Sequence, residues 1–393
     1  MSWFTSTPIS FGGGPDFFCR DSGLICKAIQ NMGLPCKSVM PLPAHQDDVT
    51  EDLIRTDPAN LERPEWWNSI GAKNVVLYSW GHPKYWRVAE AVRKSGAKVF
   101  VNLDNGGIMS PKVIPLLYFN AIMGMQMRLH GPFLGTLTGV LRSIAYRFYI
   151  PFVKEPGRIA HLRAATSIGC ISADTLVLWR LWARTYAPEL AEKMHIVPNP
   201  IADYLKYDPT VAKQDSVIAV GRWDDDEQKR PAVLADAIAT AAKRRCATEF
   251  HIYGSPGRIL PSWHDSLPRD IRKRIYLHGK VSHNEIVETF MKSRIGLCSS
   301  SHEGSHVASE EALCAGASVV TPCRSELNAL FWYVSHDSGR LSVDDSARGL
   351  AETLLLELET WDRGERNPIE ISAYWCSILS ASAVARKITE LLR

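Results

Sequence analysis

Two glutamates eight residues apart, Glu303 and Glu311, stand where an apolar run gives way to a loop and then to a helix-like segment. The run 295–298 predicts a strand and the segment 307–316 predicts a helix. In a parallel sheet, such a loop and helix start face the ligand crevice, so both carboxylates can point into one pocket. Carboxylates accept hydrogen bonds from paired hydroxyls and repel phosphate, so we expect a sugar or ribose diol as their partner. Alternatively, Glu303 is a solvated loop residue and Glu311 only favours the helix N-terminus.

Two cations, Arg222 and Lys229, stand near the start of another predicted helix. Arg222 follows a glycine at the end of the predicted strand 217–220, and Lys229 precedes a helix start at Pro231. Both therefore stand where a phosphate binds in a doubly wound sheet. A nucleotide diphosphate can be held in a cleft only against matched cations and amides, which this pair would provide. Without the downstream glutamates, Arg222 and Lys229 would read as surface salt-bridge formers.

The run EGSHVASEEALCAGASVV, which begins at Glu303, resembles the donor-binding signature of family 4 glycosyltransferases, retaining enzymes of the GT-B fold. In that signature two glutamates separated by seven residues precede an Ala-x-x-x-Gly helix end. The resemblance implies that Glu303 contacts the transferred sugar and Glu311 the ribose. The family also carries an Arg and a Lys after the first strand of its C-terminal domain, so Arg222, Lys229 and Glu303 are catalytic candidates.

The loop that follows the first glutamate differs from the family at His306, where the family usually has a glycine whose backbone contacts the sugar. A second difference is two extra residues between the Arg and the Lys, which leaves Arg230 as an alternative to Lys229. Two further loops, 254–257 and 280–282, could complete the pocket or could simply be tight connections. Ser282, at the end of the second loop, is an expected helix cap. The donor-binding residues that these motifs predict are Gly254, Val281, Glu303, Gly304, Ser305, His306, Val307 and Glu311, with Arg222 and Lys229.

The N-terminal half carries a glycine-rich turn before a helical pattern at 24–33. Backbone N–H groups of Gly13 and Gly14 could approach a phosphate, and the resemblance implies contact with the donor pyrophosphate, although three glycines also make an ordinary turn. His82 and Asp104 follow predicted strands, so both are acceptor-side candidates, or else turn and cap residues. The resemblance places a His or Asp near the second of these strand ends at the reacting centre, which makes Asp104 a catalytic candidate.

Alternating strand and helix patterns predict two parallel sheets with right-handed crossovers. With the resemblance, the fold class is α/β: GT-B, with two Rossmann-like doubly wound parallel-sheet domains facing a central cleft. We expect an acceptor-binding domain over 1–202, a nucleotide-sugar-binding domain over 203–370 and a C-terminal helix over 371–393 that crosses back to the first domain. The predicted strands are 36–40, 75–79, 98–103, 167–171, 217–220, 249–253, 274–278, 294–298 and 318–321, with a last helix over 369–392.

The composition is that of an ordinary globular protein. The chain of 393 residues exceeds what one hydrophobic core supports, and 46% hydrophobic with 22% charged residues is typical. A net charge of +3 gives no bulk argument for nucleic acid. Nine scattered cysteines without a Cys-x-x-Cys pair favour reduced thiols over disulfides or zinc. We see no signal peptide and no apolar run long enough to span a bilayer, so we expect a cytoplasmic protein.

The segment 113–165 is apolar and basic together, with Glu155 as its one acid. Such a mixture can lie in a membrane interface and gain from anionic lipid. Alternatively, these helices pack on the sheet with their basic residues solvated. The basic residues are Arg128, Arg142, Arg147, Lys154, Arg158 and Arg163.

The sequence therefore predicts a glycosyltransferase that moves a sugar from a nucleotide donor to a hydroxyl of a glycan, lipid-linked or small-molecule acceptor. The resemblance implies a retaining hexosyltransferase with a UDP- or GDP-sugar as co-substrate and no metal. A sugar-nucleotide epimerase or hydrolase is one alternative. A catalytically silent scaffold that binds a sugar nucleotide, or a membrane at its inner face, is another.

Overall fold

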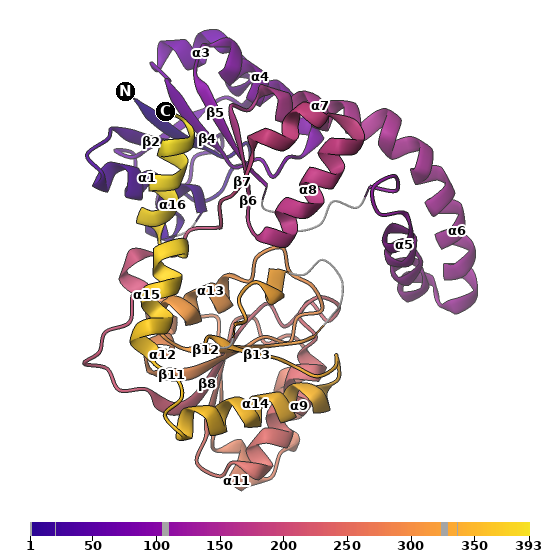
Figure 1. The fold of residues 1–393 in the computed structure, drawn as a ribbon, viewed down its shortest axis with the longest axis vertical. Helices are drawn as coiled ribbons and strands as arrows, with labels where there is room; N and C mark the ends of the chain where they lie inside the picture. The colour runs from indigo at the N-terminus through magenta and orange to yellow at the C-terminus, as the bar shows by residue number, and fades with distance from the viewer. Residues whose placement is uncertain (1, 20, 104–109, 324–328, 336) are drawn as a thin grey trace. The chain divides into compact units, whose positions relative to one another are not determined.

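The chain divides into two compact α/β units. One comprises Met1–Val197 with Ala385–Arg393, and the other comprises Pro198–Val384. The computed structural model describes residues 2–19, 21–103, 110–323, 329–335 and 337–393 (Figure 1). The catalytic candidate Asp104 lies outside these described residues.

The sheet of the first unit has seven parallel strands in the order β3-β2-β1-β4-β5-β6-β7. The inner strands β4 and β5 are almost wholly buried and carry apolar runs, and both were predicted from the sequence. The chain runs outward from β1 to β3 and then returns to β4, so strand order reverses between β1 and β4. The strands are β1 (Trp3–Ser6), β2 (Cys36–Pro41), β3 (Leu53–Thr56), β4 (Asn74–Leu77), β5 (Lys98–Leu103), β6 (Ser167–Cys170) and β7 (Met194–Ile196).

The sheet of the second unit has six parallel strands in the order β10-β9-β8-β11-β12-β13. Here strand order reverses between β8 and β11, and ligands of open α/β sheets bind outside the carboxyl ends of the strands at such a point. The strands are β8 (Gln214–Val220), β9 (Glu249–Tyr253), β10 (Ile275–Gly279), β11 (Ser293–Leu297), β12 (Ser318–Thr321) and β13 (Gly339–Leu341).

Helices connect the strands and cover the sheet faces. In the second unit α9 and α14 pack side by side (Figure 1). The α-helices are α1 (Asp21–Asn31), α2 (Pro58–Leu61), α3 (Pro64–Ser69), α4 (Trp86–Lys94), α5 (Pro115–His130), α6 (Pro132–Tyr149), α7 (Glu155–Ala164), α8 (Ala173–Tyr186), α9 (Pro231–Arg244), α10 (Ile259–Ser266), α11 (Arg269–Arg272), α12 (His283–Lys292), α13 (Val307–Cys314), α14 (Ala347–Asp362), α15 (Pro368–Leu379) and α16 (Ala381–Leu391). No helix in the described parts of the chain is both long and apolar enough to span a bilayer.

The single C-terminal helix expected over 369–392 is wrong, because the chain forms two helices, α15 and α16, that break at Ser380. Ile201 causes the break: its backbone N–H donates to the carbonyl of Leu379 at 2.8 Å, and its carbonyl accepts from Ala381 at 2.7 Å. A strand-like bridge thus replaces the helical bonds at this point. Further along, Lys98 Nζ donates to the carbonyl of Leu392 at 2.7 Å, which ties the chain end to the first unit.

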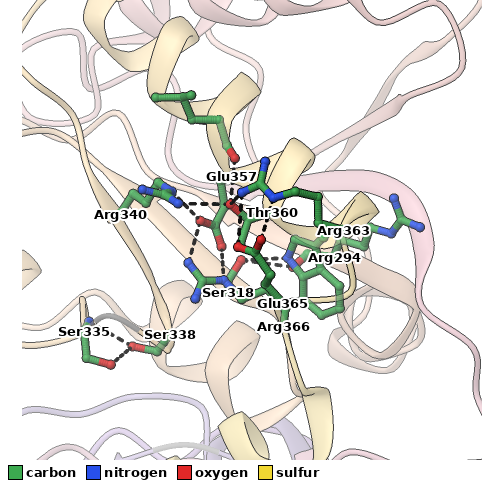
Figure 2. A network of polar contacts seen from close by, with 12 residues as sticks. Arg294, Ser318, Ser335, Ser338, Arg340, Glu357, Thr360, Arg363, Glu365 and Arg366 are labelled. Atoms are coloured by element: carbon green, nitrogen blue, oxygen red, sulfur yellow. Dashed lines mark hydrogen bonds and ion pairs between the residues drawn. The ribbon is translucent and has the colours of Figure 1, made fainter.

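A buried charge cluster fastens α14 to the edge strand β13 (Figure 2). Glu357 is fully buried and accepts from Arg340 Nε at 3.1 Å and from Arg366 Nε and Nη2, each at 2.7 Å. Because a buried carboxylate is stable only when it is paired, the two guanidiniums fix both the helix and the strand.

We expect Glu357→Ala to lower the free energy of unfolding by about 3 kcal/mol, because it removes the carboxylate that balances the buried charge of Arg366. The matched control is Glu352→Ala on the same helix, whose exposed pair with Arg244 is worth less than about 1 kcal/mol. Urea unfolding followed by circular dichroism measures both, and equal losses would contradict the structural role of the cluster.

Candidate functional site

The loops that follow β8 and β11 lie against each other at the point where strand order reverses. The backbone N–H of Ser301 donates to the carbonyl of Gln228 at 2.7 Å, and Ser299 Oγ donates to the carbonyl of Lys229 at 2.6 Å. Arg230 Nε donates in turn to the carbonyl of Ser299 at 2.7 Å. These bonds join segments 70 residues apart in sequence, so the two loops form one surface.

Lys229 and Glu303 form an ion pair on this surface. The Nζ and Oε1 atoms are 2.5 Å apart, and the two side chains are 12% and 6% exposed. Gln228 Nε2 donates to the other oxygen of Glu303 at 3.0 Å. Burial alone would raise the pKa of Glu303, but the charges of His306 and Lys229 lower it below its ordinary value. The carboxylate is therefore ionised at neutral pH and held at both oxygens.

Arg230 has a different role from its neighbour. Its backbone is left-handed, with φ of 50°, and its guanidinium binds Asp345 Oδ1 at 2.7 Å as well as the carbonyl of Ser299. It therefore anchors the loop. Lys229 instead pairs with Glu303, and its role as the cation that binds the donor stays a prediction.

His306 occupies the position where a glycine was expected from the resemblance. It is 5% exposed, its Nδ1 lies 2.7 Å from Ser309 Oγ, and its backbone N–H donates to Tyr333 Oη at 3.3 Å. Burial lowers the pKa of His306 to about 4, a shift that Glu303 opposes. The imidazole is thus neutral near pH 7, so at that pH Lys229 supplies the positive charge beside Glu303.

The two glutamates of α13 have separate environments. Glu310 is fully buried and accepts from Ser305 Oγ at 2.9 Å and Tyr333 Oη at 2.6 Å. The Oε1 atom of Glu311 lies 2.7 Å from His283 Nε2. Glu310 therefore has structural partners, while Glu311 belongs to a partly buried contact with His283.

The partners of Glu311 were not predicted from the sequence. His283 stands at the start of α12, and its Nδ1 lies 2.9 Å from Tyr204 Oη, so a tyrosine, a histidine and a glutamate form a chain of contacts. Ser282 begins this helix, and its backbone N–H donates to Glu285 at 3.2 Å, which confirms the predicted cap. Val281 lies just before the cap.

The loop that follows β9 packs against the loop that follows β8 and carries Arg222. Only a glycine at position 254 lets the two backbones come this close. Gly254 has φ of 106°, and a Cβ there would lie 1.9 Å from the carbonyl oxygen of Gly221. Trp223 N–H also donates to the carbonyl of Ser255 at 2.9 Å. Arg222, between these contacts, is 73% exposed and lies 3.8 Å from Asp225. Its guanidinium thus stands in solvent, seven residues before Lys229 in the sequence.

The glycine turn of the first unit packs against an acidic segment. Gly13 N–H donates to Asp48 Oδ1 at 2.9 Å, and a Cβ on Gly14 would lie 2.4 Å from Asp47. Arg55 pairs with Asp48 at 2.8 Å and lowers the pKa of that carboxyl. The Gly13 amide that the sequence assigned to a phosphate therefore binds a carboxylate in this structure.

His82 follows β4, at the strand-order reversal of the first unit. Its Nδ1 accepts from Lys84 N–H at 3.2 Å, and its carbonyl oxygen lies 3.0 Å from Nδ1 of the buried His161. Burial and the charge of Lys84 lower the pKa of His82. The backbone of this candidate is thus fixed, and its ring is held by a local turn.

Comparison with known proteins places the fold. Residues 214–358 match the family model of glycosyl transferases group 1. No curated protein sequence matches the chain. Among solved structures, it is similar to Anabaena Alr3699/HepE in complex with UDP, at 14% identity and TM-score 0.66 over 100% of this chain and 99% of that one. It is also similar to the apo lipopolysaccharide outer core galactosyltransferase WaaB, at 13% and 0.63 over 100% and 99%.

A third similar structure is sucrose-phosphate synthase (tll1590) from Thermosynechococcus elongatus, at 12% identity and TM-score 0.58 over 100% of this chain and 98% of that one. The predicted fold class is thus confirmed: the two parallel-sheet units match the GT-B fold. Within the described residues, no group of three or more His, Cys, Asp or Glu side chains is placed to hold a metal ion.

We expect Lys229→Met to lower the free energy of unfolding by about 3 kcal/mol at pH 7, because Glu303 would then be a buried charge without its cation. The pKa of Glu303 lies below its ordinary value in the wild type, so its stabilising contribution is present above the ordinary glutamate range and is lost as the pH falls. In the variant, burial should raise the pKa of Glu303 instead. The loss of unfolding free energy relative to the wild type should therefore be smaller at pH 5 than at pH 7.

Urea unfolding at pH 7 and pH 5 measures this difference. Lys243→Met, on the exposed side of α9, is the matched control and should change little at either pH. A loss for Lys229→Met that is the same at both pH values would contradict the ion pair.

Proposed function

We propose that the protein is a glycosyltransferase that moves a sugar from a nucleoside diphosphate donor to a hydroxyl acceptor. The observation that carries the proposal is the Lys229–Glu303 pair at the strand-order reversal between β8 and β11. The match of residues 214–358 to glycosyl transferases group 1 supports it. So do the UDP and UDP-glucose named for structures that share the fold.

The cations would bind the diphosphate. Arg222 is exposed and can offer two parallel N–H donors, whereas Lys229 supplies a point charge. Negative charge grows on the leaving diphosphate as the glycosidic bond breaks, so both cations would stabilise the transition state more than the ground state. Asp104 remains the proposed catalytic residue of the N-terminal unit.

The carboxylates would bind the diols of the donor. Glu303 is kept ionised and can accept from sugar hydroxyls, and Glu311 can accept from the ribose while His283 orients it. The small residues Gly304 and Ser305 would leave room for the donor, and Gly254, Val281 and Val307 would line the pocket. We propose UDP- or GDP-sugar as co-substrate, without a metal ion.

We further propose retention of configuration, an oxocarbenium-like transition state and transfer of a hexose to a glycan or lipid-linked acceptor. His82 and Asp104 would stand on the acceptor side. We place the reaction in the cytoplasm, with peripheral attachment to the inner face of the membrane.

A catalytically silent scaffold is the second candidate, because two observations favour it. Buried His306 fills the position of the expected glycine, and Gly13 N–H is engaged by Asp48. A panel of UDP-, GDP- and ADP-sugars, with mass spectrometry of the released nucleotide, separates the candidates. Release that needs cell extract indicates transfer, release without extract indicates hydrolysis or epimerisation, and binding without release indicates a scaffold.

We expect Arg222→Ala to weaken binding of the nucleotide sugar about tenfold to a hundredfold, because one charge-assisted contact is worth about 1.5–3 kcal/mol. Titration calorimetry with the donor that the panel identifies measures the change. Arg348→Ala, an exposed arginine on α14 of the same unit, is the control and should bind as the wild type does. Unchanged binding in Arg222→Ala would remove this residue from the site.

A further inference from the structure

Helices α5 and α6 form a hairpin that packs through glycine. Gly131 joins the two helices with φ of 77°. A Cβ on Gly135 would lie 2.3 Å from Met127 Cα, and a Cβ on Gly139 would lie 2.6 Å from Met123 Sδ. Glycines four residues apart let two helix backbones approach closely, so the small-residue face of α6 is the face that packs on α5.

The apolar residues of α6 lie on the opposite face. With 3.6 residues per turn, Phe133, Leu137 and Ile144 fall on one stripe, about half a turn away from Gly135 and Gly139. Phe133 is 89% exposed. Further exposed apolar residues of α6 and of the turn after it are Leu134, Val140, Leu141, Phe148, Tyr149, Phe152 and Val153.

This orientation is the reverse of what a helix on a protein surface normally shows. An amphipathic helix in a globular protein turns its apolar stripe toward the core, and a contiguous exposed apolar patch marks an interaction site. In Figure 1 α5 and α6 run side by side, away from the sheet of their own unit. The alternative that the sequence left open, helices packed on the sheet with solvated basic residues, therefore does not describe α6.

The charges around the stripe have one sign. Residues 110–154 contain no aspartate or glutamate but five lysines and arginines, of which Arg142, Arg147 and Lys154 are exposed on α6 and the turn after it. A basic face beside an apolar face suits the surface of an anionic bilayer, which attracts cations to its headgroups and apolar side chains to the acyl boundary. A second copy of the chain in a symmetric pair would instead bring the same cations together.

We propose that the α5–α6 hairpin docks on an anionic lipid bilayer, with α6 lying in the plane of the interface. Phe133, Leu137 and Ile144 enter the acyl boundary, while Arg147 and Lys154 contact lipid phosphates. At 1.5 Å per residue α6 lies along about 27 Å of the surface. This inference deepens the membrane attachment proposed above by naming its element and its lipid, and it does not depend on sugar transfer.

Vesicle flotation without any nucleotide sugar tests the proposal. We expect the wild type to float with vesicles of phosphatidylcholine and phosphatidylglycerol at low salt and not with phosphatidylcholine alone. The double variant Phe133→Ser, Leu137→Ser should bind at least about tenfold more weakly, since two apolar side chains no longer leave water. Arg147→Gln and Lys154→Gln should each cost about fivefold at low salt.

The matched control is Val343→Ser, which removes a 79% exposed apolar side chain in the other unit and should float as the wild type does. Circular dichroism confirms that each variant is folded. A wild type that stays unbound with anionic vesicles overturns the proposal. So does a dimer, seen by light scattering, that the double serine variant converts to monomers, because a second copy would then cover the stripe.

Nucleotide binding measured on the same preparations keeps the two proposals apart. A protein that floats but binds no nucleotide sugar ends the proposed function and leaves the membrane inference standing. A protein that binds nucleotide sugar but does not float ends the membrane inference and leaves the proposed function standing.

Discussion

The ion pair between Lys229 and Glu303 is the constraint around which the second unit is built. A carboxylate that is 6% exposed is stable only beside a cation, and the cation comes from a loop 74 residues earlier in the chain. The backbone bonds of Ser299 and Ser301 hold the two loops at the distance that the pair requires. The strand order β9-β8-β11 makes this possible, because the carboxyl ends of β8 and β11 are neighbours.

The same pair sets the chemistry that the site can perform. A phosphate that binds Lys229 has to share it with Glu303, so a donor with both a diphosphate and a diol satisfies both charges together, whereas inorganic phosphate satisfies only one. Arg222 is exposed to solvent and is not shared with Glu303 in this way. His306, neutral near pH 7, adds bulk next to Glu303 without competing for its charge. The pair therefore favours a ligand that carries both groups.

The sequence predicted those features that depend on local pattern. Continuous apolar runs gave most of the strands, and the helix at 307–316 agrees with α13 (Val307–Cys314). The edge strands β3 and β13 were missed, because each is short and has a single neighbour to bury it. The features that were not predicted depend on contacts between residues distant in sequence. Ile201 pairs with Ser380 where the last helix breaks, and Asp345 binds Arg230 but not its neighbour Lys229. Similarly, His283 contacts Glu311.

The α5–α6 hairpin shows that the net charge of a whole chain can hide a local excess of positive charge. The net charge of +3 suggests no charged partner, yet residues 110–154 hold five of the 45 lysines and arginines and none of the 42 acids. The remainder of the chain is consequently slightly acidic. An anionic surface would therefore attract the hairpin while weakly repelling the rest, so charge and the exposed stripe of α6 select the same element. The sequence showed only that this segment is apolar and basic, and the glycine contacts with α5 show that the apolar stripe of α6 faces away from α5.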